Sequence, residues 1–250
     1  MIRRLAKAIL PSGLRLKLRA GYERIQPLFY VGWSVECPCC GKCYREFLPH
    51  GRPERRNSQC RRCHAVERHR LLFLYLKNRT DFFQSKVRLL HFAPENSFRR
   101  IFSALPNVTY LSTDYSNDAD VRMDITNLAL PDETMDAIIC MHVLEHIPDD
   151  QRAMRELRRV LKPGGWAILQ VPIDLTRERT YEDFSITSPE QRRAHFGQED
   201  HVRWYGRDYA ARLESAGFTV RVDPFVRSLT KEQQWRYGLS PEEDVYFCVK

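Results

Sequence analysis

The hydrophobic positions of residues 87–250 alternate between two patterns. Short apolar runs typical of buried strands are separated by stretches with helical spacing. Strands are predicted at VRLLHF, VTYLST, MDAIICM, WAILQVP, FTVRV and DVYFCV, with a shorter extended segment at DVRMD. Helices are predicted near 96–104, at DDQRAMRELRRVLK and at RDYAARLESAG. Strands that alternate with helices predict an α/β domain whose mostly parallel sheet is covered by helices on both faces.

The first 80 residues follow a different pattern. Apolar residues scattered among basic ones predict one or two short amphipathic helices within 3–27. Residues 31–64 are rich in Cys, Gly and Arg and have little helical periodicity, whereas 66–79 has a broad apolar face that predicts a helix. We therefore expect three parts: a basic helical segment (1–30), a cysteine-rich module with a linking helix (31–80), and the α/β domain (81–250).

Charge is distributed unevenly between these parts. Residues 1–80 carry 18 Lys and Arg against 5 Asp and Glu, a balance of +13, and the remainder carries 22 against 27, a balance of −5. A basic N-terminal part could contact RNA, an anionic membrane surface or an acidic substrate, and a solvated positive surface is the simpler alternative. No signature of a known RNA-binding module accompanies it.

The sequence also predicts a cellular location. No apolar run approaches the roughly 20 residues of a membrane span. The basic N-terminus is interrupted by Pro11 and Gly13 before a signal-type apolar core develops. We therefore expect a cytoplasmic protein, and nothing in the sequence specifies an oligomeric state.

The cysteines form a candidate metal site. Cys37-x2-Cys40 and Cys60-x2-Cys63 are two pairs separated by 19 residues, and each such turn presents two thiolates on one side. Clustered cysteines in a chain without an export signal indicate metal before disulfides. These four residues predict a structural zinc site, with an unmetallated or redox-active thiol cluster as the alternative. Three further donors lie nearby: Cys39, Cys43 and His64.

Acidic residues follow three successive predicted strands. In an open parallel sheet, ligands bind beyond the carboxyl ends of the strands. The first loop, HFAPENSF, has no glycine, but Ala93 nearly permits close approach to the backbone, Pro94 fixes the turn, and Glu95 could accept a hydrogen bond from an ammonium group. Asp114 lies 19 residues later, at the spacing where a ribose diol would be held, and Asp124 follows the third segment. Each aspartate alone could merely cap a turn, but their shared register favours a cofactor site.

Five segments of the α/β domain resemble successive motifs of class I S-adenosylmethionine-dependent methyltransferases of the type 11 branch. They are VRLLHFAPE, YLSTDYS, VRMDITNLALPDETMDAIICMHVLEHIPDD, ELRRVLKPGGWAILQVP and HVRWYGRDYAARLESAGF. The resemblance covers about 85–250, is specific over 108–172, and extends to members with an N-terminal zinc-knuckle extension. It implies a Rossmann-like seven-stranded sheet with a reversed final hairpin, preceded by a zinc-ribbon-like module.

The resemblance also implies which residues bind the cofactor. Asp114 would bind the ribose hydroxyls, Asp124 and Ile125 would flank the adenine, and Met141 and His142 would lie along the cofactor. Four residues would replace the usual glycine-rich turn around the methionine moiety: Phe92, Ala93, Pro94 and Glu95.

Titratable side chains follow the fourth strand, beside the expected methyl group. His142, Glu145 and His146 are candidates for a general base or for orienting the acceptor, and each could instead only cap its loop. HVLEH also resembles the ExxEH metal motif of certain O-methyltransferases, including the ubiquinone-biosynthesis and small-RNA 2′-O types. Here His142 replaces the first glutamate and His201 is a possible fourth ligand, so the donor set disfavours Mg²⁺ relative to zinc or other transition metals.

The loop FGQEDHVRWYG (196–206) is expected at the rim of the acceptor pocket. His201 could take a proton or orient a hydroxyl group, and Arg203 could bind an anionic group on the acceptor. The alternative is a loop clamp, in which Arg203 pairs with Asp200 and Tyr205 packs inward.

These inferences predict an S-adenosylmethionine-dependent methyltransferase that acts on an oxygen or nitrogen of a small-molecule or glycan/lipid-linked acceptor. One alternative is an RNA methyltransferase whose basic zinc module, within residues 1–80, binds the phosphate backbone. The other is a non-catalytic scaffold with a methyltransferase fold, because the first loop departs from the usual glycine-rich turn.

Overall fold

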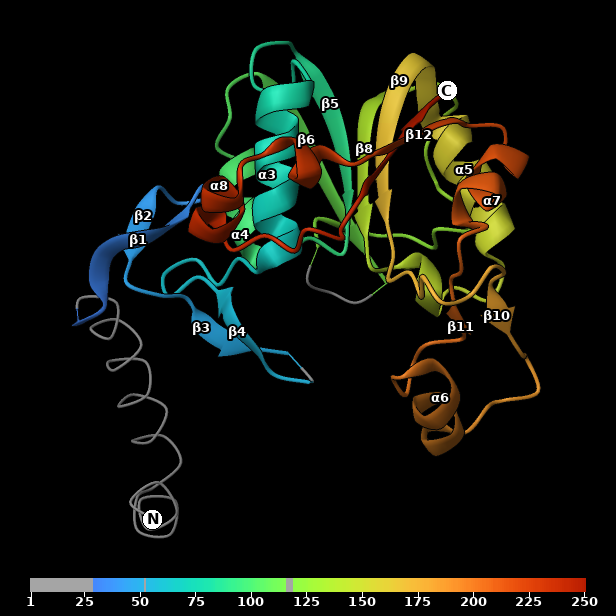
Figure 1. Cartoon of the computed structure of the whole chain (residues 1–250). Coiled ribbons are helices and arrows are strands. Elements are labelled where there is room, and N and C mark those ends of the chain that lie inside the picture. Colours follow the sequence, from blue (N-terminus) through green and yellow to red (C-terminus); the bar gives the residue numbers. More distant parts are fainter. Residues whose placement is uncertain (1–28, 52, 116–118) are drawn as a thin grey trace, which may run out of the picture. The chain divides into compact units, whose positions relative to one another are not determined.

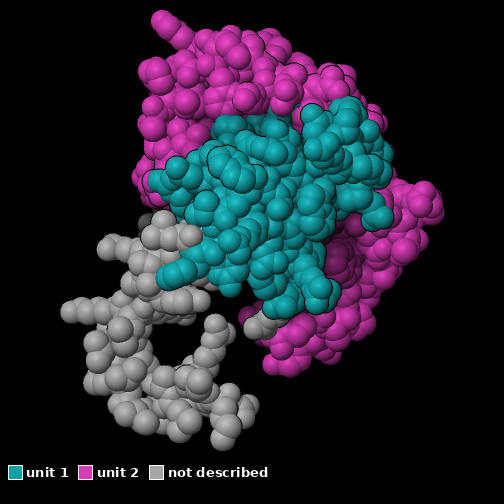
Figure 2. Space-filling view, turned by 60° about the vertical axis from the view of Figure 1, so that its left-hand side comes forward, with its two compact units in different colours: residues 1–75, 226–242 teal, residues 76–225, 243–250 magenta. Residues whose placement is uncertain are grey.

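The computed structural model of the chain describes residues 29–51, 53–115 and 119–250 (Figure 1). The helices predicted within 3–27 lie outside these ranges. The described residues form two compact units (Figure 2). Unit 1 contains the N-terminal residues up to Tyr75 together with Val226–Glu242, and unit 2 contains Leu76–Phe225 and Glu243–Lys250. In the part of the chain so described, no helix has both the length and the apolar character needed to cross a membrane.

Unit 2 is built around a seven-stranded sheet with the order β12-β13-β9-β8-β5-β6-β7. Its strands are β5 (Val87–Phe92), β6 (Val108–Asp114), β7 (Val121–Arg122), β8 (Met135–Met141), β9 (Leu161–Gln170), β12 (Thr219–Asp223) and β13 (Val245–Val249). Neighbouring strands from β9 to β7 are parallel, whereas β13 runs antiparallel to both β9 and β12. The predicted mostly parallel sheet with a reversed final hairpin is confirmed.

The sheet has helices on both faces, as predicted. α4 (Asn96–Phe102) covers one face, and α5 (Asp150–Val160) and α7 (Tyr209–Ser215) cover the other (Figure 1). The central strands β5 and β8 are buried along most of their length, which explains why they appear in the sequence as nearly continuous apolar runs. α5 begins where the Asp149 carboxylate accepts a hydrogen bond from the Arg152 amide at 2.9 Å.

The remaining elements of unit 2 lie near the carboxyl ends of the strands. They are η1 (Leu144–His146), β10 (Tyr181–Glu182), α6 (Pro189–Phe196) and β11 (Arg203–Trp204). β10 pairs with β11 in a small antiparallel ribbon, so the rim segment predicted at 196–206 includes a strand instead of being a loop throughout.

Unit 1 consists of short strands, which explains the lack of helical periodicity in 31–64. β1 (Val31–Cys37) pairs with β2 (Lys42–Tyr44), and β3 (Leu48–His50) pairs with β4 (Arg55–Gln59). α3 (Glu67–Arg79) begins in this unit and ends in unit 2. α8 (Lys231–Tyr237) belongs to unit 1, where it contacts β1.

A buried arginine joins the distant segment Val226–Glu242 to the rest of unit 1. The Arg70 guanidinium is fully buried and donates hydrogen bonds to backbone carbonyls from both parts of the unit. The acceptors are Ser58 at 2.7 Å, Ala65 at 2.7 Å, Tyr237 at 2.6 Å and Gly238 at 2.8 Å. The chain therefore leaves the sheet after β12, contributes α8 to unit 1, and returns to form β13.

Candidate active site and zinc centre

A cavity of about 460 Å³ opens at the carboxyl ends of the parallel strands in unit 2. This volume falls within the roughly 300–1,000 Å³ of typical small-ligand pockets. Its lining comes from the ends of β5, β6 and β8 and from the segments beyond them: Phe92, Ala93, Thr113, Asp114, Tyr115, Met123, Asp124, Ile125, His142, Val143, His146, Ile147 and Asp200. The cavity thus lies where an open parallel sheet is expected to bind a ligand.

Ala93 forms the bend that a glycine would usually form after β5. Its φ angle is 44°, in the left-handed region that favours glycine, and its amide donates to the Thr113 carbonyl at 2.8 Å. Alanine has the smallest side chain that still carries a Cβ atom. The loop without glycine therefore adopts a glycine-like conformation and leaves its backbone open to the cavity.

His142 and Glu145 form an imidazole–carboxylate pair at the cavity wall. Nδ1 of His142 lies 3.4 Å from Oε1 of Glu145. The His142 backbone has a φ of 55°, and its amide donates to the Gln170 carbonyl at 2.8 Å. A carboxylate beside one ring nitrogen orients the imidazole, as a general base requires.

Glu145 also belongs to a cluster with His146 and His201. One candidate ligand atom from each of the three lies within 4.8 Å of the others. The Val202 amide donates to the Glu145 carbonyl at 3.0 Å, which brings the rim segment beside η1. The two imidazole rings meet edge to face, with centroids 4.7 Å apart. Burial lowers the pKa of His201, which favours its neutral form.

Arg203 does not line the cavity. Its side chain is fully buried, and its guanidinium donates to the backbone carbonyls of Leu144 at 2.9 Å, Ile147, and Pro148 at 2.8 Å. It also pairs with the Glu182 carboxylate at 2.8 Å. The expectation that Arg203 binds an anionic group on the acceptor is therefore corrected: its guanidinium is buried and makes four hydrogen bonds within the protein.

The clamp continues through Asp150, which is buried at the start of α5. The Tyr205 hydroxyl donates to Asp150 at 2.7 Å, and Arg212 pairs with the same carboxylate at 2.8 Å. Burial, reinforced by the Asp150 charge, raises the pKa of Tyr205 and keeps its hydroxyl a donor. The clamp alternative predicted from the sequence thus describes this segment, with Glu182 and Asp150 in place of Asp200 as the partners of Arg203.

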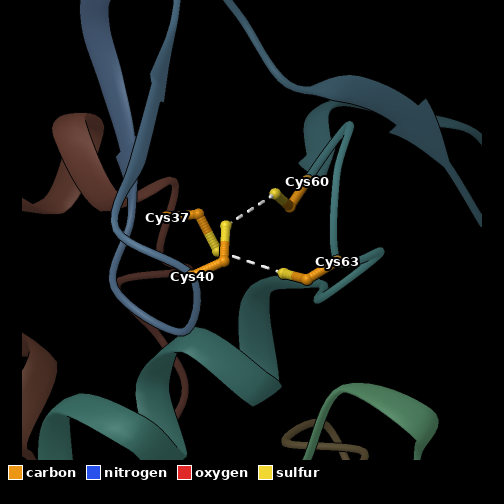
Figure 3. Close-up of side chains that lie close together, drawn as sticks. All are labelled: Cys37, Cys40, Cys60 and Cys63. Atoms are coloured by element: carbon orange, nitrogen blue, oxygen red, sulfur yellow. Dashed lines mark hydrogen bonds between the residues drawn. The ribbon is translucent and has the colours of Figure 1, made fainter. Parts of the chain in front are cut away.

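The two CxxC segments of unit 1 form matching turns. The Gly41 amide donates to the Cys37 carbonyl at 2.8 Å, and the His64 amide donates to the Cys60 carbonyl at 3.1 Å. The residue after each second cysteine has a positive φ, 65° at Gly41 and 60° at His64. This repeated geometry directs both sulfurs of each pair to one side of their turn (Figure 3).

The four sulfurs converge at a spacing that suits zinc. The Cys37 and Cys63 sulfurs are 3.5 Å apart, and those of Cys40 and Cys60 are 3.7 Å apart (Figure 3). Thiolates at the corners of a tetrahedron, each bonded to zinc at 2.3 Å, would be about 3.8 Å apart. Within the described ranges, none of the spare donors joins this group: Cys39, Cys43 and His64.

Residues 103–169 match the family model described as a methyltransferase domain. This segment is similar to a methyltransferase domain, and the match supports the methyltransferase predicted from the sequence.

Relatives of the methyltransferase domain match it over part of their length. A ubiquinone biosynthesis O-methyltransferase of Paraburkholderia phymatum is 26% identical over 119 residues, which are 46% of this chain and 49% of the relative. A 2-methyl-6-phytyl-1,4-hydroquinone methyltransferase of Oryza sativa is 32% identical over 87 residues, 34% of this chain and 24% of the relative. The chain thus spans at most about half the length of these relatives. An S-adenosylmethionine-dependent methyltransferase structure from Mesorhizobium loti matches 70% of this chain and 100% of its own, with 17% identity and a TM-score of 0.47.

The cavity of unit 2 includes six of the nine predicted cofactor-binding residues: Phe92, Ala93, Asp114, Asp124, Ile125 and His142. The other three, Pro94, Glu95 and Met141, do not line it. Met141 is buried at the end of β8, and the Glu95 carbonyl accepts the first amide hydrogen bonds of α4. The expected contacts of these three residues with the cofactor remain predictions.

The Asp124 carboxylate has partners within the protein. It accepts hydrogen bonds from the amide and the hydroxyl of Thr126, both at 2.8 Å, and these bonds lower the pKa of Asp124. The turn-capping alternative therefore describes this residue, which also presents a fixed negative charge at the cavity wall.

Thr113 is a cavity residue that sequence reasoning missed. Its hydroxyl is buried and has no hydrogen-bond partner within the described protein, although it lines the cavity next to Asp114. Its position at the end of β6 was the one feature of the sequence that could have indicated a place in the cavity. An uncharged hydroxyl within a strand pattern gives no separate indication of function.

Proposed function

We propose that the protein transfers a methyl group from S-adenosylmethionine to an oxygen or nitrogen of a small-molecule or glycan/lipid-linked acceptor. One observation carries the proposal. A single cavity is lined by Ala93, Asp114 and His142, and the His142 imidazole lies beside the buried Glu145 carboxylate.

The cavity residues fit the cofactor. The Asp114 carboxylate would accept hydrogen bonds from the ribose hydroxyls, and Met123 and Ile125 supply an apolar surface for the adenine. The unpartnered Thr113 hydroxyl offers a further hydrogen bond. When bound, S-adenosylmethionine supplies a methyl group on positively charged sulfur. The acidic wall formed by Asp114 and Asp124 suits a ligand with that charge.

Changing Asp114 to alanine should weaken binding of S-adenosylhomocysteine by about 1–3 kcal/mol, because a charged hydrogen bond to the ribose is lost. Titration calorimetry measures the affinity, and the melting temperature reports folding. Asp132→Ala, which changes an exposed aspartate of the same unit, should bind like the wild type. Unchanged affinity in folded Asp114→Ala would remove this residue from the site.

His142 is the proposed general base. Its Nδ1 faces Glu145, so Nε2 is the nitrogen that could take a proton from the acceptor. His142→Asn should lower kcat by about 100-fold or more while S-adenosylhomocysteine affinity changes little. Asparagine is chosen because it tolerates the left-handed backbone at this position. His195→Asn, on exposed α6, is the matched control, and full activity in His142→Asn would contradict the assignment.

The overall activity is tested by measuring S-adenosylhomocysteine release with a panel of phenols, catechols, sugars, amines and RNA. RNA is the second candidate acceptor because Phe29 and Trp33 of the basic N-terminal part are largely exposed, as base-stacking side chains would be. RNA binding that weakens steeply with salt, followed by RNA methylation, would favour it. A folded chain that binds no S-adenosylhomocysteine would instead support a scaffold.

A further inference from the structure

We propose that Glu145, His146 and His201 bind a transition-metal cation at the cavity wall, and that this metal binds a hydroxyl oxygen of the acceptor. The inference rests on the proposed methyl transfer and narrows its acceptor to an oxygen nucleophile. It differs from the HVLEH interpretation, because His142 is assigned as the base and not as a ligand.

The three proposed ligands lie close together. One ligand atom from each residue lies within 4.8 Å of the other two, so one cation can reach all three. Three protein ligands with a remaining open position are typical of catalytic metal sites, whereas four closed ligands are typical of structural ones. His146 itself lines the cavity, which places the open position toward the acceptor.

The Glu145 side chain is buried, and the residue is only 1% exposed. Neither carboxylate oxygen has a hydrogen-bond partner among the described residues, and the nearest cationic group to form an ion pair with it is His142, whose Nδ1 lies 3.4 Å away. A buried carboxylate without hydrogen bonds is costly to the fold. A divalent cation between Glu145 and the two imidazoles would remove that cost.

Neighbouring groups orient the imidazole rings of His146 and His201. A metal-binding histidine usually donates its second ring N–H to a carbonyl or carboxylate. Nδ1 of His146 lies 3.3 Å from both the carbonyl and the carboxylate of Asp200, which leaves Nε2 for the metal. His201 has a hydrogen bond to the Phe196 backbone, and its buried Nδ1 has no partner among the described residues.

The surrounding structure fixes these ligands before a metal arrives. Arg203 donates to the Leu144 carbonyl in η1, and the Val202 amide donates to the Glu145 carbonyl. The segment that carries His201 is thereby fastened to the one that carries Glu145. Such support is what a metal site needs to keep its ligands within coordination distance.

The donor set favours particular metals. Two imidazoles and one carboxylate suit zinc, manganese, iron, cobalt or nickel, whereas Mg²⁺ and Ca²⁺ prefer oxygen ligands alone. A cation here would act as a Lewis acid that lowers the pKa of a bound hydroxyl group and orients its oxygen.

The proposed transfer of the methyl group to the acceptor oxygen involves one proton transfer and one displacement. The acceptor hydroxyl loses its proton to Nε2 of His142. The oxygen uses a lone pair to form the new O–CH₃ bond while the S–CH₃ bond breaks. The electrons of the broken bond stay on sulfur, which becomes a neutral thioether, and the metal does not change oxidation state. An amine acceptor has no comparable need for this metal, so the site favours hydroxyl acceptors.

The test uses the full chain with its cysteine site loaded with zinc. Mn²⁺ is added, and the loss of the free-ion signal in electron paramagnetic resonance measures binding. We expect one Mn²⁺ per chain and an affinity lowered by about tenfold or more in Glu145→Gln and in His201→Gln. Glu190→Gln and His195→Gln on exposed α6 are matched controls and should bind Mn²⁺ like the wild type.

Two results would overturn the metal site: no Mn²⁺ binding at millimolar concentration, or binding that survives both ligand substitutions. Glu145→Gln keeps the side-chain shape, so this variant still tests the metal site in the event that His201→Gln does not fold. Calorimetry with S-adenosylhomocysteine separates the two proposals. A chain that binds S-adenosylhomocysteine but no Mn²⁺ would overturn only the metal site. A chain that binds Mn²⁺ but no S-adenosylhomocysteine would overturn the methyl transfer. Mn²⁺ should stimulate methylation of a catechol by the wild type but not by Glu145→Gln, and methylation of amines alone would overturn the hydroxyl acceptor.

Discussion

Replacing Arg203 with methionine should lower the free energy of unfolding by about 3–5 kcal/mol. Methionine keeps much of the side-chain volume but none of the hydrogen bonds. The loss would leave three backbone carbonyls and the Glu182 carboxylate without their buried partner. Removing one member of a buried charged network costs far more than the network contributes relative to a well-packed apolar core, because the remaining charge stays desolvated.

Urea unfolding followed by tryptophan fluorescence measures this change. Arg207→Met is the matched control, because Arg207 lies four residues away, is exposed, and pairs loosely with Glu178 at 3.5 Å. It should change the free energy of unfolding by less than about 0.5 kcal/mol. An equally small effect of Arg203→Met would show that the clamp does not stabilise the fold.

We predict that the four cysteines hold zinc, and that its removal unfolds much of unit 1 and leaves S-adenosylhomocysteine binding by unit 2 nearly unchanged. Structural zinc sites contribute about 10–16 kcal/mol of binding free energy in small modules at pH 7, and this energy is available only to the folded state. The sheets of unit 1 are two-stranded and built from short strands, whereas unit 2 has a seven-stranded sheet.

Elemental analysis should find one zinc ion per chain in the wild type and none in Cys60→Ser, whereas Cys43→Ser, outside the cluster, should retain it. Hydrogen exchange after chelation should accelerate in residues 31–64. It should also accelerate in 226–242, because Arg70 joins that segment to the Cys60–Ala65 turn. Protein prepared without chelator that contains no zinc would refute the assignment, as would unchanged exchange in both segments.

The sheet could be predicted from the sequence because the pattern that specifies each strand lies within a short stretch of residues. Buried parallel strands such as β5 and β8 are continuous apolar runs, and Gly or Asp residues mark the ends of the helices between them. The strands of unit 1 are too short and too polar for such a pattern. The grouping of α8 with unit 1 depends on hydrogen bonds from Arg70 to residues more than 160 positions away, which no local pattern records.

The site was predictable to the extent that topology determined it. Residues that end adjacent parallel strands meet at one edge, which explains why Asp114 and His142 line the same cavity. Side-chain direction and distant partners are not contained in spacing. Arg203 therefore resembled an anion-binding residue, although its partners Asp150 and Glu182 lie 53 and 21 positions earlier in the chain.

The position of β13 has a consequence for the order in which the chain folds. β12 pairs only with β13, and β13 occupies the place between β12 and β9. Until β13 arrives, β9 presents an unpaired edge and β12 has no neighbour, and open edges invite association with other chains. Between these strands the polypeptide passes through unit 1, where Arg70 holds the turn after α8. Completion of the sheet during synthesis is thus a late, long-range event, and delay in folding the cysteine module would prolong the exposure of an aggregation-prone edge.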